Sequence, residues 1–374
     1  MYCWLRLKAG TGKSTLVKFI ISALNLNQED VAYVAFTGKA ANVLTQKGCP
    51  NATTAHKLLY HARQLPNGKF TFAPKKVLEH RYKLIVVDEI SMLPIQMWEL
   101  LLKHKIYILV CGDPAQLSPI DKDADNHVLD HPHIFLDEIM RQAQESEIIR
   151  LSMDIRAGNP LPKHYNGNEV IIIPEKELVS GMYDWADQII CATNNKRNTI
   201  NFDIRSLKGY STEPQIGDKV IALRNYWDIV SENSELALTN GTIGTLQSFE
   251  LGMRTPPIYI ADSAYNILNS TISTDENDTF TDLEIDYKFF TSGQKSLTPQ
   301  QEFLLRKNKN INFGPPMEFA YAYAITCWKA QGSEWNKILL FEEKFPFDIN
   351  EHKRYLYTGL TRAKEKIVIV KKEN

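Results

Sequence analysis

The stretch Ala9-Gly10-Thr11-Gly12-Lys13-Ser14-Thr15 decides the fold, because it follows a short apolar segment and opens a helical pattern from Thr15 to Leu24. Its glycines let backbone N–H groups curl around phosphate oxygens, and the helix start adds a partial positive charge. This is the pattern of a phosphate-binding P-loop, although Leu7 stands where its first glycine is expected. Lys13 would reach the β- and γ-phosphates, and Ser14 would ligate Mg²⁺. We predict a nucleotide site at Gly10, Thr11, Gly12, Lys13, Ser14 and Thr15.

Short apolar runs follow the P-loop and are separated by stretches long enough for helices. They lie at residues 31–36, 83–87 and 106–111, and each ends at a Gly, Asp or Thr turn. Continuous apolar runs of this length are typical of buried parallel strands. The first part of the chain is therefore expected to be a doubly wound α/β domain.

Two of these strands deliver polar groups that suit phosphate chemistry. Asp88 and Glu89 follow the run Leu84–Val87, so Asp88 is placed to hold Mg²⁺ and Glu89 to orient or deprotonate a water molecule. Gln116 follows the next strand and can touch both a γ-phosphate and that water. A solvated acid pair and a plain turn are the alternative interpretations, but the upstream P-loop argues against them.

A second α/β pattern begins at residues 188–192 and returns between residues 320 and 370. Between these parts, residues 251–315 are polar, and strands are expected at 258–261 and 282–290. Asn67-Gly68 is a strong hairpin turn signal inside residues 64–72. The predicted fold is therefore α/β, with a β-hairpin insertion in the first half and a β-rich insertion in the second.

The composition of the 374 residues is that of an ordinary globular protein, with a net charge of −1. A near-neutral net charge does not by itself indicate nucleic-acid binding. It does not exclude such binding either, because a local stripe of basic side chains is enough for a protein that binds few phosphates at a time. The sequence contains no run of about 18 apolar residues, so no membrane span is expected. Five scattered cysteines predict a reducing, cytoplasmic location, which includes the host cytoplasm if a phage encodes the protein.

Further motifs follow in a fixed order along the chain, besides the P-loop, Asp88-Glu89 and the Gly112–Gln116 turn. They are residues 35–41 (AFTGKAA), 52–59 (ATTAHKLL), 138–142 (EIMRQ), 189–194 (IICATN), 217–220 (GDKV), 240–244 (NGTIG), 323–334 (YAITCWKAQGSE) and 355–364 (YLYTGLTRAK). In this order they resemble superfamily 1 helicases of the RecD/Dda type, and the resemblance covers nearly the whole chain.

This resemblance implies two RecA-like motor domains with ATP bound in the cleft that they form. The first would comprise residues 1–62 and 83–160, and the second residues 161–250 and 316–374. Residues 63–82 would form the hairpin that separates strands, and residues 251–315 a small β-barrel insertion. Closing and opening of the cleft on ATP would drive stepping along a DNA strand.

The resemblance also assigns roles to individual residues. The catalytic groups would be Lys13, Glu89, Gln116, Arg141 and Arg362, of which the two arginines supply positive charge to the transferring phosphoryl group. Gly332 and Glu334 would join the nucleotide site. The DNA contacts would be Thr37, His56, Thr326, Trp328 and Lys329, where Trp328 replaces the histidine usual in the family and is expected to stack. Phe70 and Phe72 share one face of the hairpin and would stack on the last base pair.

The expected function is ATP-dependent DNA unwinding with 5′-to-3′ travel on single-stranded DNA, by a monomer that uses ATP and Mg²⁺. Its partners would be single-stranded and fork DNA, together with a single-strand-binding or replication protein. Replication, repair and recombination all stay open. Two other functions also stay open: a nucleic-acid-binding protein with an impaired ATPase, and a P-loop NTPase that does not act on DNA.

The residues ahead of Gly10 contain no Gln, Asn or Asp, whereas the family normally has there a Gln that reads adenine. Apolar contact alone discriminates weakly between bases. We therefore expect GTP to support DNA-stimulated hydrolysis within about tenfold of ATP, which is about 1.4 kcal/mol of discrimination.

Overall fold

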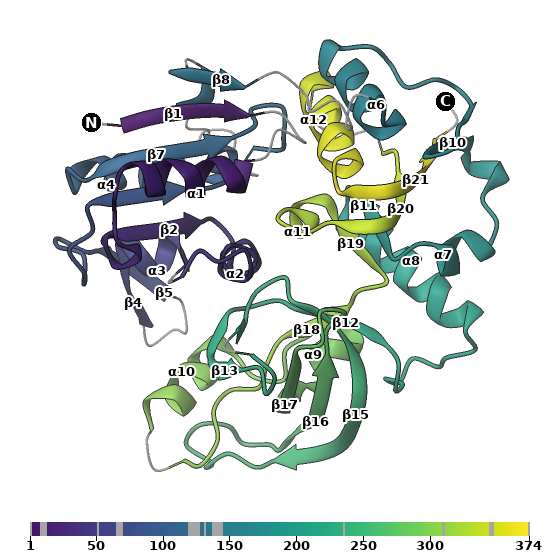
Figure 1. Ribbon diagram of the computed structural model, residues 1–374. Helices are drawn as coiled ribbons and strands as arrows, with labels where there is room; N and C mark the ends of the chain where they lie inside the picture. The colour runs from purple at the N-terminus through teal and green to yellow at the C-terminus, as the bar shows by residue number, and fades with distance from the viewer. Residues whose placement is uncertain are drawn as a thin grey trace. The chain divides into compact units, whose positions relative to one another are not determined.

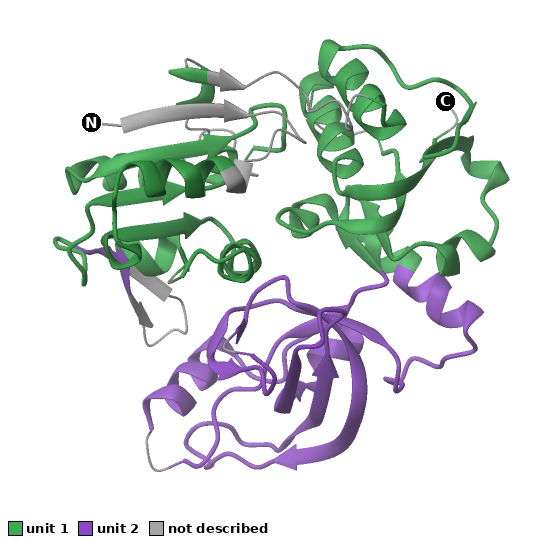
Figure 2. Cartoon of the chain, in the orientation of Figure 1, with its two compact units in different colours: residues 1–59, 76–200, 324–374 green, residues 60–75, 201–323 purple. Residues whose placement is uncertain are grey.

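The chain divides into two compact units in a computed structural model (Figure 2). Unit 1 comprises residues 1–59, 76–200 and 324–374, and unit 2 comprises residues 60–75 and 201–323. For residues 2–7, 13–15, 62–64, 70–72 and 135–136 only the course of the backbone is described. The residues that the structure describes are 2–7, 13–50, 52–64, 70–118, 128–130, 132–136, 145–234, 236–308, 311–343 and 348–372.

The first sheet of unit 1 has six strands, all parallel, in the order β3-β2-β6-β7-β1-β8 (Figure 1). Apolar runs were expected at 31–36, 83–87 and 106–111, and the structure confirms a strand in each. The strands are β1 (Tyr2–Leu7), β2 (Val31–Ala35), β3 (Thr53–Thr54), β6 (Leu84–Val87), β7 (Tyr107–Gly112) and β8 (Ile134–Leu136).

Helices cover this sheet and bury their apolar side chains against it. Val17 and Ile21 of α1 pack with Tyr33, Val86 and Leu109 of three strands in one buried cluster. Each of these side chains is at most 7% exposed, and removing such area from water stabilises the fold by about 25 cal/mol per Å². The helices of this part are α1 (Lys13–Ala23), η1 (Gln28–Asp30), α2 (Gly38–Gln46), α3 (Ala55–Leu59), η2 (Ile90–Met92), α4 (Ile95–Lys103) and η4 (Val128–Asp130).

The second sheet of unit 1 has the order β19-β11-β20-β21-β10-β9, with only β9 antiparallel to its neighbour. Its strands are β9 (Tyr165–Asn166), β10 (Val170–Pro174), β11 (Gln188–Cys191), β19 (Ala324–Thr326), β20 (Trp335–Phe341) and β21 (Ala363–Lys371). The helices around it are α6 (Glu147–Ala157), η5 (Glu175–Glu177), α7 (Gly181–Trp185), α8 (Asn194–Leu207), α11 (Cys327–Ala330) and α12 (Ile349–Leu360). One parallel and one mostly parallel sheet, each with flanking helices, confirm the predicted α/β class.

Unit 2 is built on an antiparallel sheet in the order β17-β16-β15-β12-β18. Its sheet strands extend well beyond the predicted range 251–315. The elements are β12 (Lys219–Ala222), β13 (Tyr226–Val230), β14 (Ala237–Leu238), β15 (Ile243–Arg254), β16 (Tyr265–Ser273), β17 (Thr279–Asp286), α9 (Tyr287–Ser292), α10 (Pro299–Lys307) and β18 (Phe319–Tyr321).

The strand predictions inside residues 251–315 were correct only in part. The strand predicted at 258–261 is wrong, because residues 258–260 form a turn in which Ile260 N–H donates to the Pro257 carbonyl at 2.8 Å. Pro256 and Pro257 lack the N–H group that a strand ladder needs, so pairing stops before them. The strand predicted at 282–290 exists as β17 up to Asp286, where the Asp286 side chain caps α9 by accepting from Phe289 N–H.

A two-stranded hairpin is formed by β4 (Tyr60–Gln64) and β5 (Phe70–Pro74), with Gln64 opposite Phe70 and Ala62 opposite Phe72. This antiparallel pairing agrees with the turn signal of Asn67-Gly68, which itself lies outside the described residues. The hairpin groups with unit 2 in the division of the chain.

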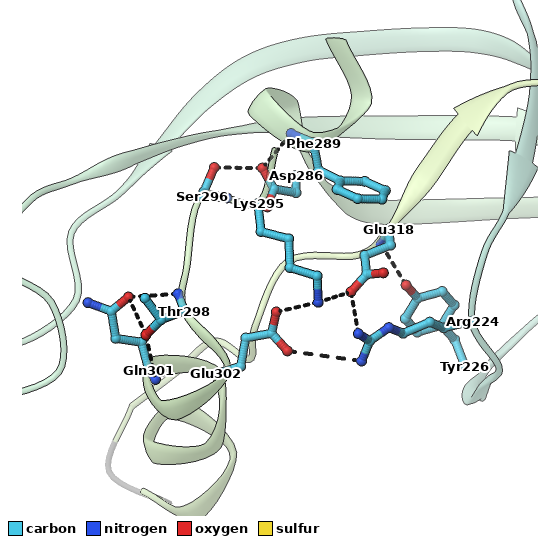
Figure 3. A network of polar contacts seen from close by, with 10 residues as sticks. All are labelled: Arg224, Tyr226, Asp286, Phe289, Lys295, Ser296, Thr298, Gln301, Glu302 and Glu318. Carbon is cyan, nitrogen blue, oxygen red and sulfur yellow. Dashed lines mark hydrogen bonds and ion pairs between the residues drawn. The ribbon is translucent and has the colours of Figure 1, made fainter. Parts of the chain in front are cut away.

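An ion network ties α10 to the sheet of unit 2 (Figure 3). Lys295 Nζ lies 3.1 Å from Glu302 and 2.6 Å from Glu318, and Arg224 lies 2.6 Å from Glu318 and 4.0 Å from Glu302. Both carboxylates therefore sit between two cations, which offsets part of the cost of burying them. Among the described residues, no helix is long and apolar enough to cross a membrane.

Candidate nucleotide and nucleic-acid site

The polar groups predicted for phosphate chemistry follow neighbouring parallel strands. Strand β7 lies between β6 and β1, so the ends of β6 and β7 meet at one edge of the sheet. Asp88 and Glu89 follow β6, and Asp113 follows β7. Helix α1 starts at Lys13, two residues before the start expected from the sequence. Gly10, Thr11, Gly12 and the side chains of Lys13, Ser14 and Thr15 lie outside the described residues.

The backbone bends sharply at the acidic pair. Asp88 N–H donates to the Val34 carbonyl at 2.9 Å and thereby extends the strand ladder by one residue. Glu89 then adopts a left-handed conformation with φ of 51° and ψ of 47°. A non-glycine residue there costs of the order of 1 kcal/mol, and such outliers cluster at functional sites. Asp88 Oδ1 accepts from Glu89 N–H at 3.0 Å, so the two acids share one fixed turn.

The donor set of this turn fits a hydrated magnesium ion. A carboxylate oxygen is the kind of hard ligand that Mg²⁺ prefers, and Asp88 offers one at the end of a rigid buried strand. Among the described residues, no group of three or more His, Cys, Asp or Glu side chains is arranged to hold a metal ion by itself.

The segment Asp113–Ser118 carries the predicted γ-phosphate sensor, Gln116, which is 3% exposed. The Asp113 carboxylate accepts from Ala115 N–H at 3.0 Å, and the Gln116 N–H donates to the Asp113 carbonyl at 3.1 Å. Asp113 also accepts from Arg156 Nη1 at 2.9 Å and from the Tyr357 hydroxyl at 2.5 Å. This carboxylate therefore organises the turn that presents Gln116.

Arg362 is 6% exposed and lies just beyond α12. Its Nε donates to the Thr358 carbonyl at 3.2 Å, and its Nη1 donates to the Ser333 carbonyl at 3.4 Å. Its Nη2 donates to the Thr361 hydroxyl at 3.5 Å, and all three of these acceptors are neutral. Arg141, the other predicted arginine, lies outside the described residues.

Gly332 makes a close approach to α2 within unit 1. It has φ of +77°, and a Cβ atom placed on it would lie 3.1 Å from the Ala40 Cβ and 3.3 Å from the Ala40 Cα. Both the backbone conformation and the available space therefore require glycine. Nearby, Lys39 Nζ lies 5.5 Å from the centroid of the Trp335 ring, and Glu334 is exposed. The predicted nucleotide contacts at Gly332 and Glu334 stay predictions.

Thr37 and His56, predicted to bind DNA, follow β2 and β3 of the first sheet. The Thr37 hydroxyl caps α2 by accepting from Ala40 N–H at 3.2 Å, so it retains its own O–H as a donor. The His56 ring lies 5.8 Å from the Phe36 ring. Burial lowers the pKa of His56, so the imidazole is neutral at pH 7 and suits stacking or a single hydrogen bond.

Thr326, Trp328 and Lys329 lie at the end of β19 and on α11. Trp328 Nε1 donates to the Ser118 carbonyl at 3.4 Å, which is a weak contact to the segment that carries Gln116. Burial lowers the pKa of Lys329, and the nearby Arg197 lowers it further.

The hairpin aromatics Phe70 and Phe72 stand on alternate positions of β5, and their side chains lie outside the described residues. Sequence reasoning missed Asp113, Arg156 and Tyr357 as a group. The acid directly after a buried strand was the one available signal for Asp113. Nothing local marks Arg156, whose partner is 43 residues away.

Comparisons with known proteins identify relatives of both halves of unit 1. Residues 2–173 match the family described as an AAA domain, and residues 321–370 match the UvrD-like helicase C-terminal domain. The ATP-dependent RecD2 DNA helicase of Deinococcus radiodurans is 26% identical over 386 residues, which covers 96% of this chain and 45% of that protein. The ATP-dependent DNA helicase dda of Enterobacteria phage T4 is 24% identical over 251 residues, covering 64% of this chain and 49% of its own. The chain spans about half the length of these curated relatives.

Solved structures share the fold over nearly the whole chain. Bacteroides Pif1 bound to ssDNA has a TM-score of 0.56 and 17% identity, and the match covers 98% of this chain and 88% of that one. The Pif1 helicase of Candida albicans has a TM-score of 0.52 and 16% identity, covering 99% and 90% of the two chains. At these identities the similarity shows the fold.

Proposed function

We propose that the chain is a superfamily 1 helicase of the RecD and Dda type, which hydrolyses ATP to move along single-stranded DNA and to unwind duplex DNA. The observation that carries the proposal is the arrangement at the edge of the first sheet. A P-loop sequence precedes α1, an acidic pair ends β6 in a left-handed turn, and a neutral amide follows β7.

Each group has a distinct role in the proposed hydrolysis. Glu89 accepts a proton from the attacking water, or orients that water, while Gln116 holds it against the γ-phosphate. Lys13 and Arg362 stabilise the negative charge that develops on the transferring phosphoryl group, with Arg141 as a further candidate. Arginine fingers of this kind accelerate phosphoryl transfer by roughly 10³–10⁵.

Asp88 and Ser14 would hold Mg²⁺. When bound, the ion would neutralise charge on the phosphate oxygens. Gly332 and Glu334 are proposed to complete the nucleotide site.

The DNA strand is proposed to contact Thr37 and His56 from the first sheet, and Thr326, Trp328 and Lys329 from the second. Lys329 binds a phosphate, and the Trp328 indole stacks on a base, for which about 1–3 kcal/mol is typical. The hairpin residues Phe70 and Phe72 stack on the last base pair of the duplex. Travel is 5′ to 3′, and fork DNA is the substrate.

Turnover measured with and without single-stranded DNA tests the proposal. The parent chain should hydrolyse ATP only slowly until DNA is added, and Mg²⁺ should be required. Lys13→Ala and Glu89→Gln should each abolish turnover, and Phe70→Ala or Phe72→Ala should slow unwinding while DNA-stimulated hydrolysis persists. Hydrolysis that is indifferent to DNA would instead identify a P-loop NTPase of another class, and DNA binding without any turnover would identify a binding protein.

A further inference from the structure

Three residues on one side of α12 contact the segment that carries Gln116. Arg354 Nη1 donates to the Ser118 hydroxyl, the Tyr357 hydroxyl donates to the Asp113 carboxylate at 2.5 Å, and the Thr358 hydroxyl accepts from Leu117 N–H at 2.9 Å. Positions 354, 357 and 358 share one face because residues three and four apart are neighbours on a helix. This face of α12 therefore holds the segment on both sides of Gln116.

The contacts made by Tyr357 and Thr358 are buried, so losing either one leaves a polar group that water cannot reach. Asp113 is 1% exposed, Leu117 is 2% exposed, and both Tyr357 and Thr358 are 1% exposed or less. On its other side, the Leu117 carbonyl accepts from Gln331 Nε2 at 3.3 Å. Leu117 is thus held through both of its backbone groups, and Gln116 is held between two anchored residues.

Thr358 also contacts the predicted arginine finger. Its hydroxyl accepts from Leu117 N–H, and its carbonyl accepts from Arg362 Nε at 3.2 Å. One residue therefore joins the neighbour of Gln116 to Arg362. These two groups come from chain segments about 245 residues apart, and both are assigned to the same γ-phosphate under the proposed function.

We propose that Tyr357 and Thr358 are positioning residues that set Gln116 and Arg362 as one unit for phosphoryl transfer. Tyr357 acts through the Asp113 carboxylate, and Thr358 acts through Leu117 N–H and its own carbonyl. The proposal rests on the proposed ATPase function and names the residues that give that function its geometry.

A positioning role predicts a loss in kcat with little change in KM, because ground-state binding is left intact. Tyr357→Phe removes one hydroxyl, and Thr358→Val removes one hydroxyl at constant shape. Each should lower the DNA-stimulated kcat by about tenfold, equal to about 1.4 kcal/mol, while KM for ATP stays within about twofold. Thr358→Ser keeps the hydroxyl and should restore most of the rate.

Tyr355→Phe is the matched control. Tyr355 lies on the same helix and is 0% exposed. Its hydroxyl donates at 2.5 Å to the carbonyl of Phe341, the last residue of β20 in the second sheet. It should lower the unfolding midpoint as Tyr357→Phe does, yet keep the parent kcat.

Steady-state hydrolysis and urea unfolding on these four variants decide the matter. A kcat loss confined to Tyr357→Phe and Thr358→Val, with rescue in Thr358→Ser, supports the proposal. Parent kcat in both variants, or an equal loss in Tyr355→Phe, overturns it while the ATPase assignment stands. If Thr358→Val does not fold, Tyr357→Phe against Tyr355→Phe gives the same decision. A parent chain without DNA-stimulated turnover overturns the proposed function first and the positioning roles with it.

Discussion

Asp218→Ala is expected to remove a large part of the stability of unit 2. Arg205 and Asp218 form an ion pair whose side chains are 5% and 0% exposed. The other terminal nitrogen of Arg205 donates to the carbonyls of Ser211 at 2.6 Å and Glu213 at 2.5 Å. Asp218 is the only carboxylate among these acceptors, so its loss leaves a buried guanidinium with neutral partners alone.

The magnitude follows from what the substitution leaves behind. Removing one partner of a buried ion pair costs about 3–5 kcal/mol, because the remaining charge is uncompensated. Asp218 also accepts from Gln215 N–H at 2.7 Å and from the Tyr323 hydroxyl at 2.8 Å, and each orphaned donor adds to the cost. The free energy of unfolding of a domain is only about 5–15 kcal/mol in total, so the loss of this single carboxylate would remove a large part of it.

Urea unfolding followed by peptide-resolved hydrogen exchange is the suitable assay, since a chain with two compact units need not unfold in one step. With a urea m-value of about 1–3 kcal/mol per molar, peptides from β15 to β17 should lose protection at least about 1 M earlier in Asp218→Ala. Glu232→Ala is the matched control within unit 2: Glu232 is exposed and accepts from the Thr281 hydroxyl at 2.9 Å, so its loss should cost at most about 1 kcal/mol. A midpoint for Asp218→Ala equal to that of Glu232→Ala would refute the reasoning.

Three other outcomes are expected. Gly332→Ala should destabilise the chain by more than Gly293→Ala, and the midpoints of urea unfolding measure the difference. Both glycines have positive φ, but only at position 332 would the new Cβ lie against Ala40. Trp328→Ala should weaken binding of fluorescent single-stranded DNA at saturating ATP, and unchanged affinity with a normal melting temperature would remove Trp328 from the DNA site. Burial raises the pKa of the Cys327 thiol to about 12, so native Cys327 should resist iodoacetamide at pH 8, and rapid labelling of the native protein seen by mass spectrometry would contradict this. The contribution of the protonated thiol to the free energy of unfolding, present below pH 9, should be lost as the pH rises towards 12.

Much of the fold could be predicted because local patterns in the amino-acid sequence indicate it. Continuous apolar runs marked β2, β6, β7 and β11, since strands buried on both faces exclude polar side chains whatever lies next to them. The glycine-rich stretch before Lys13 marked the start of α1, and the acids at 88 and 89 were recognised from their place at a strand end. The resemblance added candidate DNA contacts that no local pattern marks, such as Thr37 and Trp328, and these stay predictions.

The extent of the sheet in unit 2 could not be predicted, because β12, β15 and β18 are joined by antiparallel pairing between residues that are far apart in sequence. Alternating polar strands of this kind carry a weak local signal. The apolar run at 258–260 was misleading for the opposite reason, since it looks like a strand locally, while the two prolines before it end the ladder.

What the sequence determined by itself is the class of the fold and the place of an acidic pair and a glutamine after neighbouring strands of the first sheet, because each rests on a few residues adjacent in the chain. Only the tertiary structure decided how the site is held. The Arg156–Asp113–Tyr357 contacts and the hydrogen bond from Leu117 N–H to the Thr358 hydroxyl join segments that are distant in the sequence. A hydrogen bond requires its two atoms within about 3 Å, and sequence separation says nothing about that distance until the chain has folded.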